Sequence, residues 1–275
     1  MEDVLVTLIL LAACVIFFFP IYTIVSVSLK LPIDIMASPP RWLFQPTLQN
    51  YEALVGIRPS EFQFDLPLHF RNSLVTAGGS TLLSLVLGTP AAYAFARIRF
   101  RGDQFGLLAL LAMRMLPPIT TVIPLFLLMK NFRLLDTSIA LILAYTTFNL
   151  PFVIWMLRSF FIDLPSELEE ASWIDGASRW QAILYVILPL SAPGLVAAAI
   201  FSLMLAWNDF LFAVILTSRN ASTLPVLAAG FTTEMGVSWG IMMAAGSVIV
   251  LPVLIFTLFV QRYLVAGLTS GAMKG

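Results

Sequence analysis

Six stretches of this 275-residue chain are apolar and long enough to cross a lipid bilayer as helices. A helix needs about 20 mostly apolar residues to cover a hydrocarbon core of roughly 30 Å. Because lipid offers no hydrogen bonds, each crossing has to satisfy its backbone groups internally, as an α-helix does. We therefore expect an all-α integral membrane fold with six transmembrane helices, at residues 4–29, 73–96, 105–129, 138–161, 193–217 and 240–263.

The composition supports the same fold class. The chain is 60% apolar and 11% charged, whereas soluble domains are close to 45–50% apolar and about 25% charged. A water-soluble enzyme is therefore excluded. We expect residues 1–275 to form a single transmembrane domain.

The charges and the rare residues exclude several kinds of site. Lys and Arg total 15 and Asp and Glu total 15, so no net positive field is present to hold nucleic acid, and no nucleic-acid partner is expected. With Cys14 and His69 as the single residues of their types, no disulfide framework or two-histidine metal motif can form. Phosphate-binding and hydrolase motifs do not occur, so we expect no catalytic residue, metal or cofactor on this chain.

The orientation in the membrane follows from a cluster of arginines after the second stretch. Arg97, Arg99 and Arg101 lie within seven residues. Short loops rich in Lys and Arg remain in the cytoplasm, although counting every Lys and Arg on each side gives no bias for this chain. The cluster predicts cytoplasmic ends, an extracytoplasmic loop at residues 30–72, and a cytoplasmic tail at residues 264–275.

The most polar segment lies between the fourth and fifth stretches, at residues 163–189. Ser166 with Glu169, and Ser178 with Gln181, have the spacing of capping boxes that start helices. Gly176 lies between them, where a left-handed residue would end the first helix. The segment therefore predicts two short helices joined at the glycine, the second ending at Leu188, before Pro189.

This segment resembles the EAA loop of permease subunits in bacterial ATP-binding-cassette importers. The resemblance rests on Glu170-Ala171-Ser172, on Gly176 after three intervening residues, and on Val186-Ile187-Leu188-Pro189. Ser172 and Val186 depart from the usual pattern but keep its size and shape. Other segments resemble the sugar-importing branch related to the maltose permeases: Asn72-Ser73, residues 91–97, Trp207-Asn208-Asp209 and residues 267–275.

The resemblance implies that this loop is a coupling helix that docks on a cytoplasmic ATPase subunit. Small residues would let the partner approach closely, and acidic residues would meet basic groups with charge-assisted hydrogen bonds. The docking residues carried over are Glu167, Leu168, Glu170, Ala171, Ser172, Asp175 and Gly176.

The resemblance also implies an assembly in the bacterial cytoplasmic (inner) membrane, surrounded by lipid. Its other members would be a second permease subunit of different sequence, two ATPase subunits that bind ATP and Mg²⁺, and an extracytoplasmic solute-binding protein. The transport cycle would be alternating access, in which ATP binding in the ATPase pair moves the coupling helix and the crossings.

Two charged residues lie within apolar stretches, Arg114 in the third and Asp209 in the fifth. A charge at the bilayer centre costs roughly 2.5–3.5 kcal/mol, so each should face protein or a water-filled cavity. They are expected to pair with each other or with the partner subunit. A role in helix packing is favoured over direct substrate contact.

Polar and aromatic residues near prolines in the third to fifth stretches are candidates for a solute path. Broken helices commonly line such paths, and amides and rings suit a neutral polyhydroxy solute. The candidates are Tyr145, Asn149, Trp155 and Asn208. The same residue types also serve helix packing and interface anchoring, so that interpretation stays open.

Two alternatives remain at this point. A stand-alone secondary transporter or channel would need its own ion-coupling site, and a membrane-integral enzyme would need catalytic groups. The sequence does not identify the substrate, because sugars, polyols and glycerol phosphates are all carried by the branch that the chain resembles.

Overall fold

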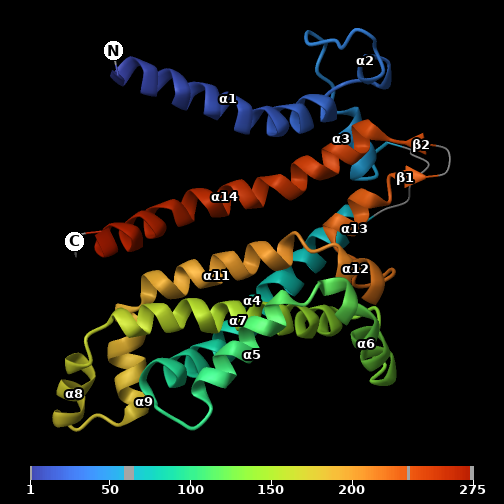
Figure 1. The fold of residues 1–275 in the computed structure, drawn as a ribbon. Helices are drawn as coiled ribbons and strands as arrows, with labels where there is room; N and C mark the ends of the chain where they lie inside the picture. Colours follow the sequence, from blue (N-terminus) through green and yellow to red (C-terminus); the bar gives the residue numbers. More distant parts are fainter. Residues whose placement is uncertain (1, 59–64, 234–235, 273–275) are drawn as a thin grey trace. The chain divides into compact units, whose positions relative to one another are not determined.

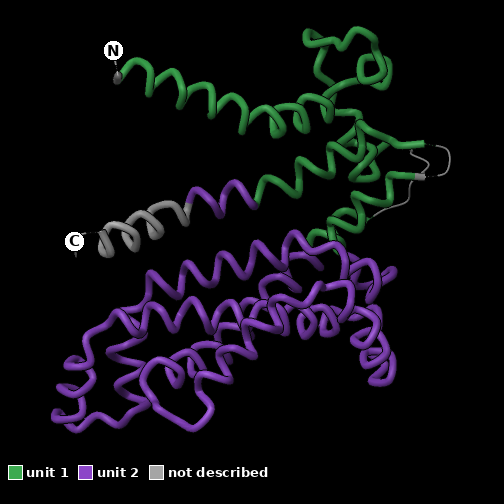
Figure 2. Tube along the Cα trace, viewed as in Figure 1, with its two compact units in different colours: residues 1–70, 223–252 green, residues 71–222, 253–275 purple. Residues whose placement is uncertain are grey.

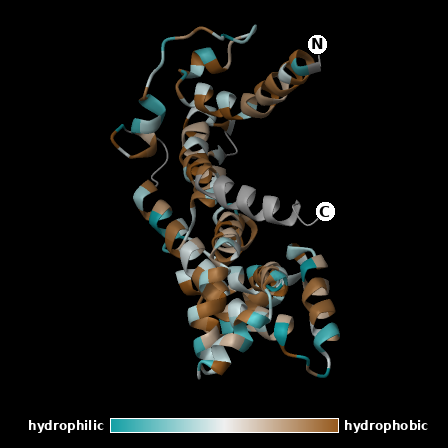
Figure 3. Ribbon diagram, turned by 90° about the vertical axis from the view of Figure 1, so that its left-hand side faces the viewer, coloured by the Kyte–Doolittle hydropathy of each residue, from teal (hydrophilic) through white to brown (hydrophobic). Residues whose placement is uncertain are grey.

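The computed structural model describes residues 2–58, 65–233 and 236–272, and almost all of this part of the chain is helical (Figure 1). Within the described residues, the strands β1 (Thr232–Thr233) and β2 (Gly236–Val237) form a short antiparallel pair. Most residues of the helices are hydrophobic, and hydrophilic residues are more frequent in the loops and at helix ends (Figure 3). This is the distribution expected of helices surrounded by lipid.

Four helices are long and apolar enough to cross a membrane, and up to six spans result if each of two bent helix pairs counts as one. The four long helices correspond to the first, second, fourth and sixth expected stretches. They are α1 (Glu2–Ser28), α4 (Leu66–Arg97), α7 (Ser138–Asp163) and α14 (Trp239–Ala272). The all-α membrane fold is thereby confirmed.

The third expected stretch, residues 105–129, is not one continuous helix. It contains α5 (Asp103–Met115) and α6 (Pro118–Asn131), which meet at an angle of 96°. Leu116 and Pro117 have extended backbone angles. The break follows from two consecutive prolines, because a residue before proline is disfavoured in the α conformation and proline has no N–H to donate.

The fifth expected stretch, residues 193–217, is also interrupted. Its helix α11 (Ala192–Trp207) ends before Asn208, and α12 (Leu211–Leu216) follows. The helical segment before it, α9 (Arg179–Ala182), η1 (Ile183–Ile187) and α10 (Leu188–Leu190), meets α11 at 77°. This second helix of the polar loop therefore continues past Pro189 and ends at Leu190, two residues beyond the expected end.

The chain divides into two compact units (Figure 2). The first unit comprises residues 1–70 and 223–252, with the short helices α2 (Pro32–Ile35), α3 (Gln49–Leu54) and α13 (Leu224–Ala229). In it, Asn50 donates hydrogen bonds to the carbonyl oxygens of Ser28 and Lys30.

The second unit comprises residues 71–222 and 253–275. Its core lies where α4, α7, η1 and α11 meet, and α11 packs along α7. The buried side chains there are Ala92, Tyr93, Val153, Ile154, Leu157, Phe161, Ile183, Ile187 and Ala198. In this unit the polar loop lies at one end of α7, and α6 and α12 lie at the other (Figure 1).

Candidate functional site

The polar loop between α7 and α11 folds as an elbow of two helices. The first is α8 (Glu167–Ile174), and Gly176 follows it with a φ of 88°, a left-handed conformation that favours glycine. At the start of α9, Gln181 N–H donates to Ser178 Oγ at 3.4 Å, and Ser178 N–H donates to Gln181 Oε1 at 2.7 Å. The expected glycine turn and second capping box are therefore confirmed.

The prediction of a capping box between Ser166 and Glu169 is wrong. Ser166 has helical backbone angles and its side chain makes no capping hydrogen bond. The Glu169 carboxylate points away from the helix start and is only 3% exposed. This carboxylate forms hydrogen bonds with another helix instead.

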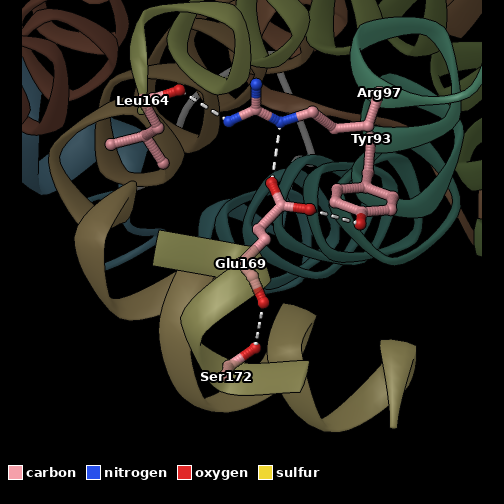
Figure 4. A network of polar contacts seen from close by, with 5 residues as sticks. All are labelled: Tyr93, Arg97, Leu164, Glu169 and Ser172. Carbon is pink, nitrogen blue, oxygen red and sulfur yellow. Dashed lines mark hydrogen bonds and ion pairs between the residues drawn. The ribbon is translucent and has the colours of Figure 1, made fainter. Parts of the chain in front are cut away.

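Glu169 binds two residues of α4 (Figure 4). The Tyr93 hydroxyl donates to Glu169 Oε2 at 2.8 Å, and Arg97 Nε donates to Oε1 at 2.7 Å. Arg97 Nη2 also donates to the Leu164 carbonyl at 2.6 Å, and Ser172 Oγ donates to the Glu169 carbonyl at 2.7 Å. We call Tyr93, Arg97 and Glu169 the anchor network. It holds α8 to the last turn of a membrane-spanning helix.

Sequence reasoning did not assign the anchor network. Tyr93 and Arg97 are four residues apart, which places them on one face of α4, but nothing local indicates that they meet a residue about 70 positions later. The one available signal was the surplus of acidic residues in the first turn of α8, where Glu167, Glu169 and Glu170 exceed the needs of a helix start.

The expected docking residues lie mainly on the outer surface of the elbow. Ser172 is half-buried, and the others, Glu167, Leu168, Glu170, Ala171, Asp175 and Gly176, are exposed. Three large apolar side chains beside them are exposed as well: Trp173, Ile174 (86%) and Trp180 (65%). An exposed patch that combines apolar and acidic side chains is typical of a surface that binds another protein.

The two charged residues of the apolar stretches do not pair with each other. Among the described residues, no ion pair joins Arg114 to Asp209. Arg114 donates a long hydrogen bond of 3.5 Å to the Phe148 carbonyl, and its guanidinium lies 5.1 Å from the centre of the Phe152 ring. Asp209 accepts from the Phe212 N–H at 3.0 Å, which satisfies the start of α12.

Two of the four path candidates share a cavity with both charges. This cavity has a volume of about 180 Å³, and Arg114, Tyr145, Asn149 and Asp209 line it. Asn208 is exposed and lines a neighbouring cavity of about 570 Å³ with Asp209. Trp155 lies apart from these cavities, and its side chain is 54% exposed.

A second feature that the sequence did not indicate joins two loops at the other end of α7. Asp136, between α6 and α7, accepts hydrogen bonds from the backbone N–H groups of residues 218–221, at 2.9–3.3 Å, and from Asn220 Nδ2 at 2.8 Å. Burial alone would raise the pKa of Asp136, but these backbone hydrogen bonds lower it to about 2. The folded loop therefore favours the charged carboxylate.

A pH dependence follows for this pair of loops. The pKa of Asp136 is lower in the folded protein than its ordinary value of 3.8, so its stabilising effect is complete above about pH 4 and is lost as the pH falls to about 2. We expect the amides of residues 218–221 to lose protection from hydrogen exchange over this interval. In Asp136→Asn, protection should be weaker at pH 7 and should lack that step; a profile identical to the wild type would contradict the assignment.

Comparison with known proteins identifies the family to which this chain is similar. Residues 84–270 match the family described as the inner membrane component of binding-protein-dependent transport systems. The trehalose transport system permease protein SugB of Mycobacterium tuberculosis is 42% identical over 236 residues, which cover 83% of this chain and 82% of the relative. The trehalose/maltose transport system permease protein MalG of Thermococcus litoralis is 37% identical over 234 residues, which cover 84% and 83%.

A solved structure shares the fold. It is a bacterial ABC transporter involved in the import of the acidic polysaccharide alginate, with a TM-score of 0.78, 21% identity, and coverage of 95% of this chain and 96% of that one. The expectations of a transport subunit and of an inner-membrane location are confirmed by the family match, and the ATPase is a separate subunit. This chain belongs to the family of inner membrane components of binding-protein-dependent transport systems, as a multi-pass permease of an ABC importer.

Proposed function

We propose that this permease imports a sugar or a related neutral polyhydroxy solute, and that residues 163–189 form its coupling loop. The substrate class is supported by the two relatives named for trehalose and for trehalose and maltose, which match more than four fifths of the chain. The coupling role is supported by the geometry of the elbow.

The anchor network is the observation that carries the coupling role. A coupling element needs an outer face that binds the ATPase and an inner attachment that passes movement to a membrane span. Glu170 and Ala171 are exposed on α8. The preceding residue, Glu169, is buried and hydrogen-bonded to Tyr93 and Arg97. A displacement of α8 by an ATPase would therefore act on α4 directly, because buried charge-assisted hydrogen bonds resist extension.

The other members of the proposed assembly would supply ATP hydrolysis, the second half of the transport path and solute delivery. Its sequence holds no phosphate-binding loop, so ATP and Mg²⁺ would bind to two cytoplasmic ATPase subunits. A second permease subunit would complete the transport path, and an extracytoplasmic binding protein would deliver the solute at the end of α7 that carries α6 and α12. Alternating access would then be driven from the opposite end, where α8 lies.

Cysteine labelling tests both the side of the membrane and the docking role. The chain has one cysteine, Cys14, so Cys14→Ser provides a background for Ala171→Cys on α8 and, as a matched exposed control, Asn131→Cys at the end of α6. With a membrane-impermeant maleimide, Ala171→Cys should react in inside-out vesicles and Asn131→Cys in right-side-out vesicles. In the assembled importer the ATPase subunits should block the first reaction and leave the second unchanged.

Two outcomes would overturn the coupling role. One is labelling of Ala171→Cys from outside the cell. The other is equal labelling of that cysteine with and without the ATPase subunits, because a docked surface excludes the reagent.

A further inference from the structure

We propose that Arg114, Tyr145 and Asp209 form a binding subsite for sugar hydroxyl groups where two broken helices face each other. The inference rests on the proposed sugar-import function and deepens it by naming residues that would bind the solute during transport. The subsite is the cavity of about 180 Å³ in the second unit, and its other lining residues are Leu116, Pro118, Phe148, Asn149, Leu205, Ala206 and Phe212.

The cavity lies at two interruptions of the helical backbone. Arg114 is in the last turn of α5, before the break at Leu116 and Pro117, and Asp209 is in the gap between α11 and α12. Within a membrane, non-helical backbone is tolerated only where protein buries it or where it lines a water-filled cavity. Discontinuous helices of this kind place polar groups at solute sites in transporters.

The charges of the cavity are incompletely used by the described protein. A guanidinium has five N–H donors and a carboxylate accepts about four hydrogen bonds. Arg114 makes one long hydrogen bond of 3.5 Å, and Asp209 accepts from the backbone N–H groups of Phe212 and Ala213 and interacts with the Tyr145 hydroxyl. Opposite charges that line one cavity without an ion pair leave donors and acceptors for a ligand that offers both, as a sugar diol does.

The Tyr145 hydroxyl provides an independent indication of a ligand. Tyr145 is 3% exposed and lines the cavity, yet its hydroxyl makes no hydrogen bond of good geometry with a described residue. Its one partner among the described residues is the Asp209 carboxylate, with which it forms a weak, poorly aligned hydrogen bond. A buried hydroxyl whose one partner is a poorly aligned carboxylate is incompletely hydrogen-bonded, which costs free energy, and a solute in the cavity would supply the missing hydrogen bond.

The apolar part of the lining suits the same ligand class. Phe148 and Phe212 contact each other with ring centres 4.8 Å apart, and both line the cavity. Solute sites typically combine such apolar surfaces with a few well-placed polar groups that determine orientation. The C–H faces of a sugar ring would pack on the aromatic rings while its hydroxyls meet Arg114, Tyr145 and Asp209.

Tyr145→Phe is the decisive variant, because a ligand role predicts a loss of uptake at nearly constant melting temperature, whereas a packing role predicts a lower melting temperature. Because the hydroxyl makes only a poorly aligned hydrogen bond with Asp209, removing it should change the melting temperature of the protein little. If the hydroxyl binds the solute in transit, uptake should fall about threefold to tenfold, the effect of one hydrogen bond. Asp209→Asn, which keeps an acceptor for the Phe212 N–H but loses the charge, should lower uptake as well.

Ser84→Ala is the matched control. Ser84 carries a buried hydroxyl without a hydrogen-bond partner among the described residues, but it lies on α4 and does not line this cavity. The complete importer, with its partner subunits and saturating binding protein, is reconstituted in liposomes, and initial rates of trehalose and maltose uptake are measured. Ser84→Ala should transport both sugars at the wild-type rate.

The outcomes separate the subsite from the function on which it rests. If the wild-type importer takes up neither these sugars nor any other sugar or polyol of a panel, the proposed sugar function fails, and the subsite fails with it. If the wild type takes up a sugar and Tyr145→Phe does so at the same rate, the subsite alone is overturned. A loss in Tyr145→Phe that is matched by a lower melting temperature, or by an equal loss in Ser84→Ala, also overturns it.

Discussion

Glu169→Ala is expected to separate ATP hydrolysis from solute uptake in the assembled importer. The substitution leaves the Arg97 guanidinium, whose side chain is 17% exposed, without its carboxylate, and leaves the Tyr93 hydroxyl without its acceptor. Removing one partner of a buried ion pair costs about 3 kcal/mol or more. Because α8 would no longer be held to α4, the variant should hydrolyse ATP with little uptake and should melt at a lower temperature.

The neighbouring residue provides a control on the same helix. Glu170 is exposed, and no hydrogen bond or ion pair of its side chain is seen in the described structure. Glu170→Ala should change stability by less than about 0.5 kcal/mol and should act only by weakening ATPase association. The measurements are uptake per ATP hydrolysed and melting temperature, with Tyr93→Phe as a milder variant. If Glu169→Ala and Glu170→Ala behave alike in both, the anchor network has no coupling role.

Gly194→Val is expected to prevent stable packing of α11 on α7. A Cβ atom at Gly194 would lie 2.5–2.8 Å from three ring atoms of Phe160, including Cγ, which is fixed close to the backbone. Small residues at helix contacts allow this close approach in membrane proteins, and overfilling a well-packed contact costs about 1–3 kcal/mol. Valine adds two further methyl groups, so the yield of folded protein in detergent should fall sharply.

Gly78→Ala is the matched control for this prediction. Gly78 lies inside α4, and a Cβ atom there would have no neighbour within 4 Å. Because glycine in a helix is less stable than alanine by roughly 0.5–1 kcal/mol, this variant should be as stable as the wild type or more so. Size-exclusion chromatography and thermal unfolding of both variants decide the question. Comparable stability of Gly194→Val and Gly78→Ala would show that the contact with Phe160 adjusts freely.

The sequence predicted those features of the elbow that depend on neighbouring residues alone. Gly176 adopts the left-handed φ of 88° that its position after α8 suggested, and Ser178 forms its capping box with Gln181. Both features depend on residues a few positions apart. The spacing of these residues in the sequence was therefore enough to predict the glycine turn and the capping box.

The same signal failed at the start of α8 because the distant partners of Glu169 form stronger hydrogen bonds. Ser166 and Glu169 have the spacing of a capping box, but Glu169 gains a charge-assisted hydrogen bond from Arg97 and another from Tyr93. Such bonds are roughly twice as strong as neutral ones. Spacing within the loop contains no information about α4. The sequence therefore could not show that Glu169 binds α4 instead of completing a capping box.

The interrupted spans show an intermediate case. Pro117 and Pro118 break the third stretch for a reason visible in the sequence, yet the angle of 96° between α5 and α6 depends on packing. The fifth stretch breaks after Trp207 without any proline, where Asp209 accepts a hydrogen bond from the Phe212 N–H in the first turn of α12. Hydropathy measures how apolar a stretch is and does not detect whether its helix is continuous.

The amino-acid pattern by itself determined that this chain is a helical membrane protein, and the elbow motif indicated an ABC permease. The first depends on the length and apolarity of the stretches, and the second on the resemblance of one short motif to the EAA loop. The tertiary structure alone decided that Glu169 anchors the elbow, that Asp136 joins two loops, and that Arg114, Tyr145 and Asp209 line one cavity. Those outcomes depend on which distant side chains become neighbours after the helices pack, and the free energies of such contacts exceed the local preferences of the residues involved.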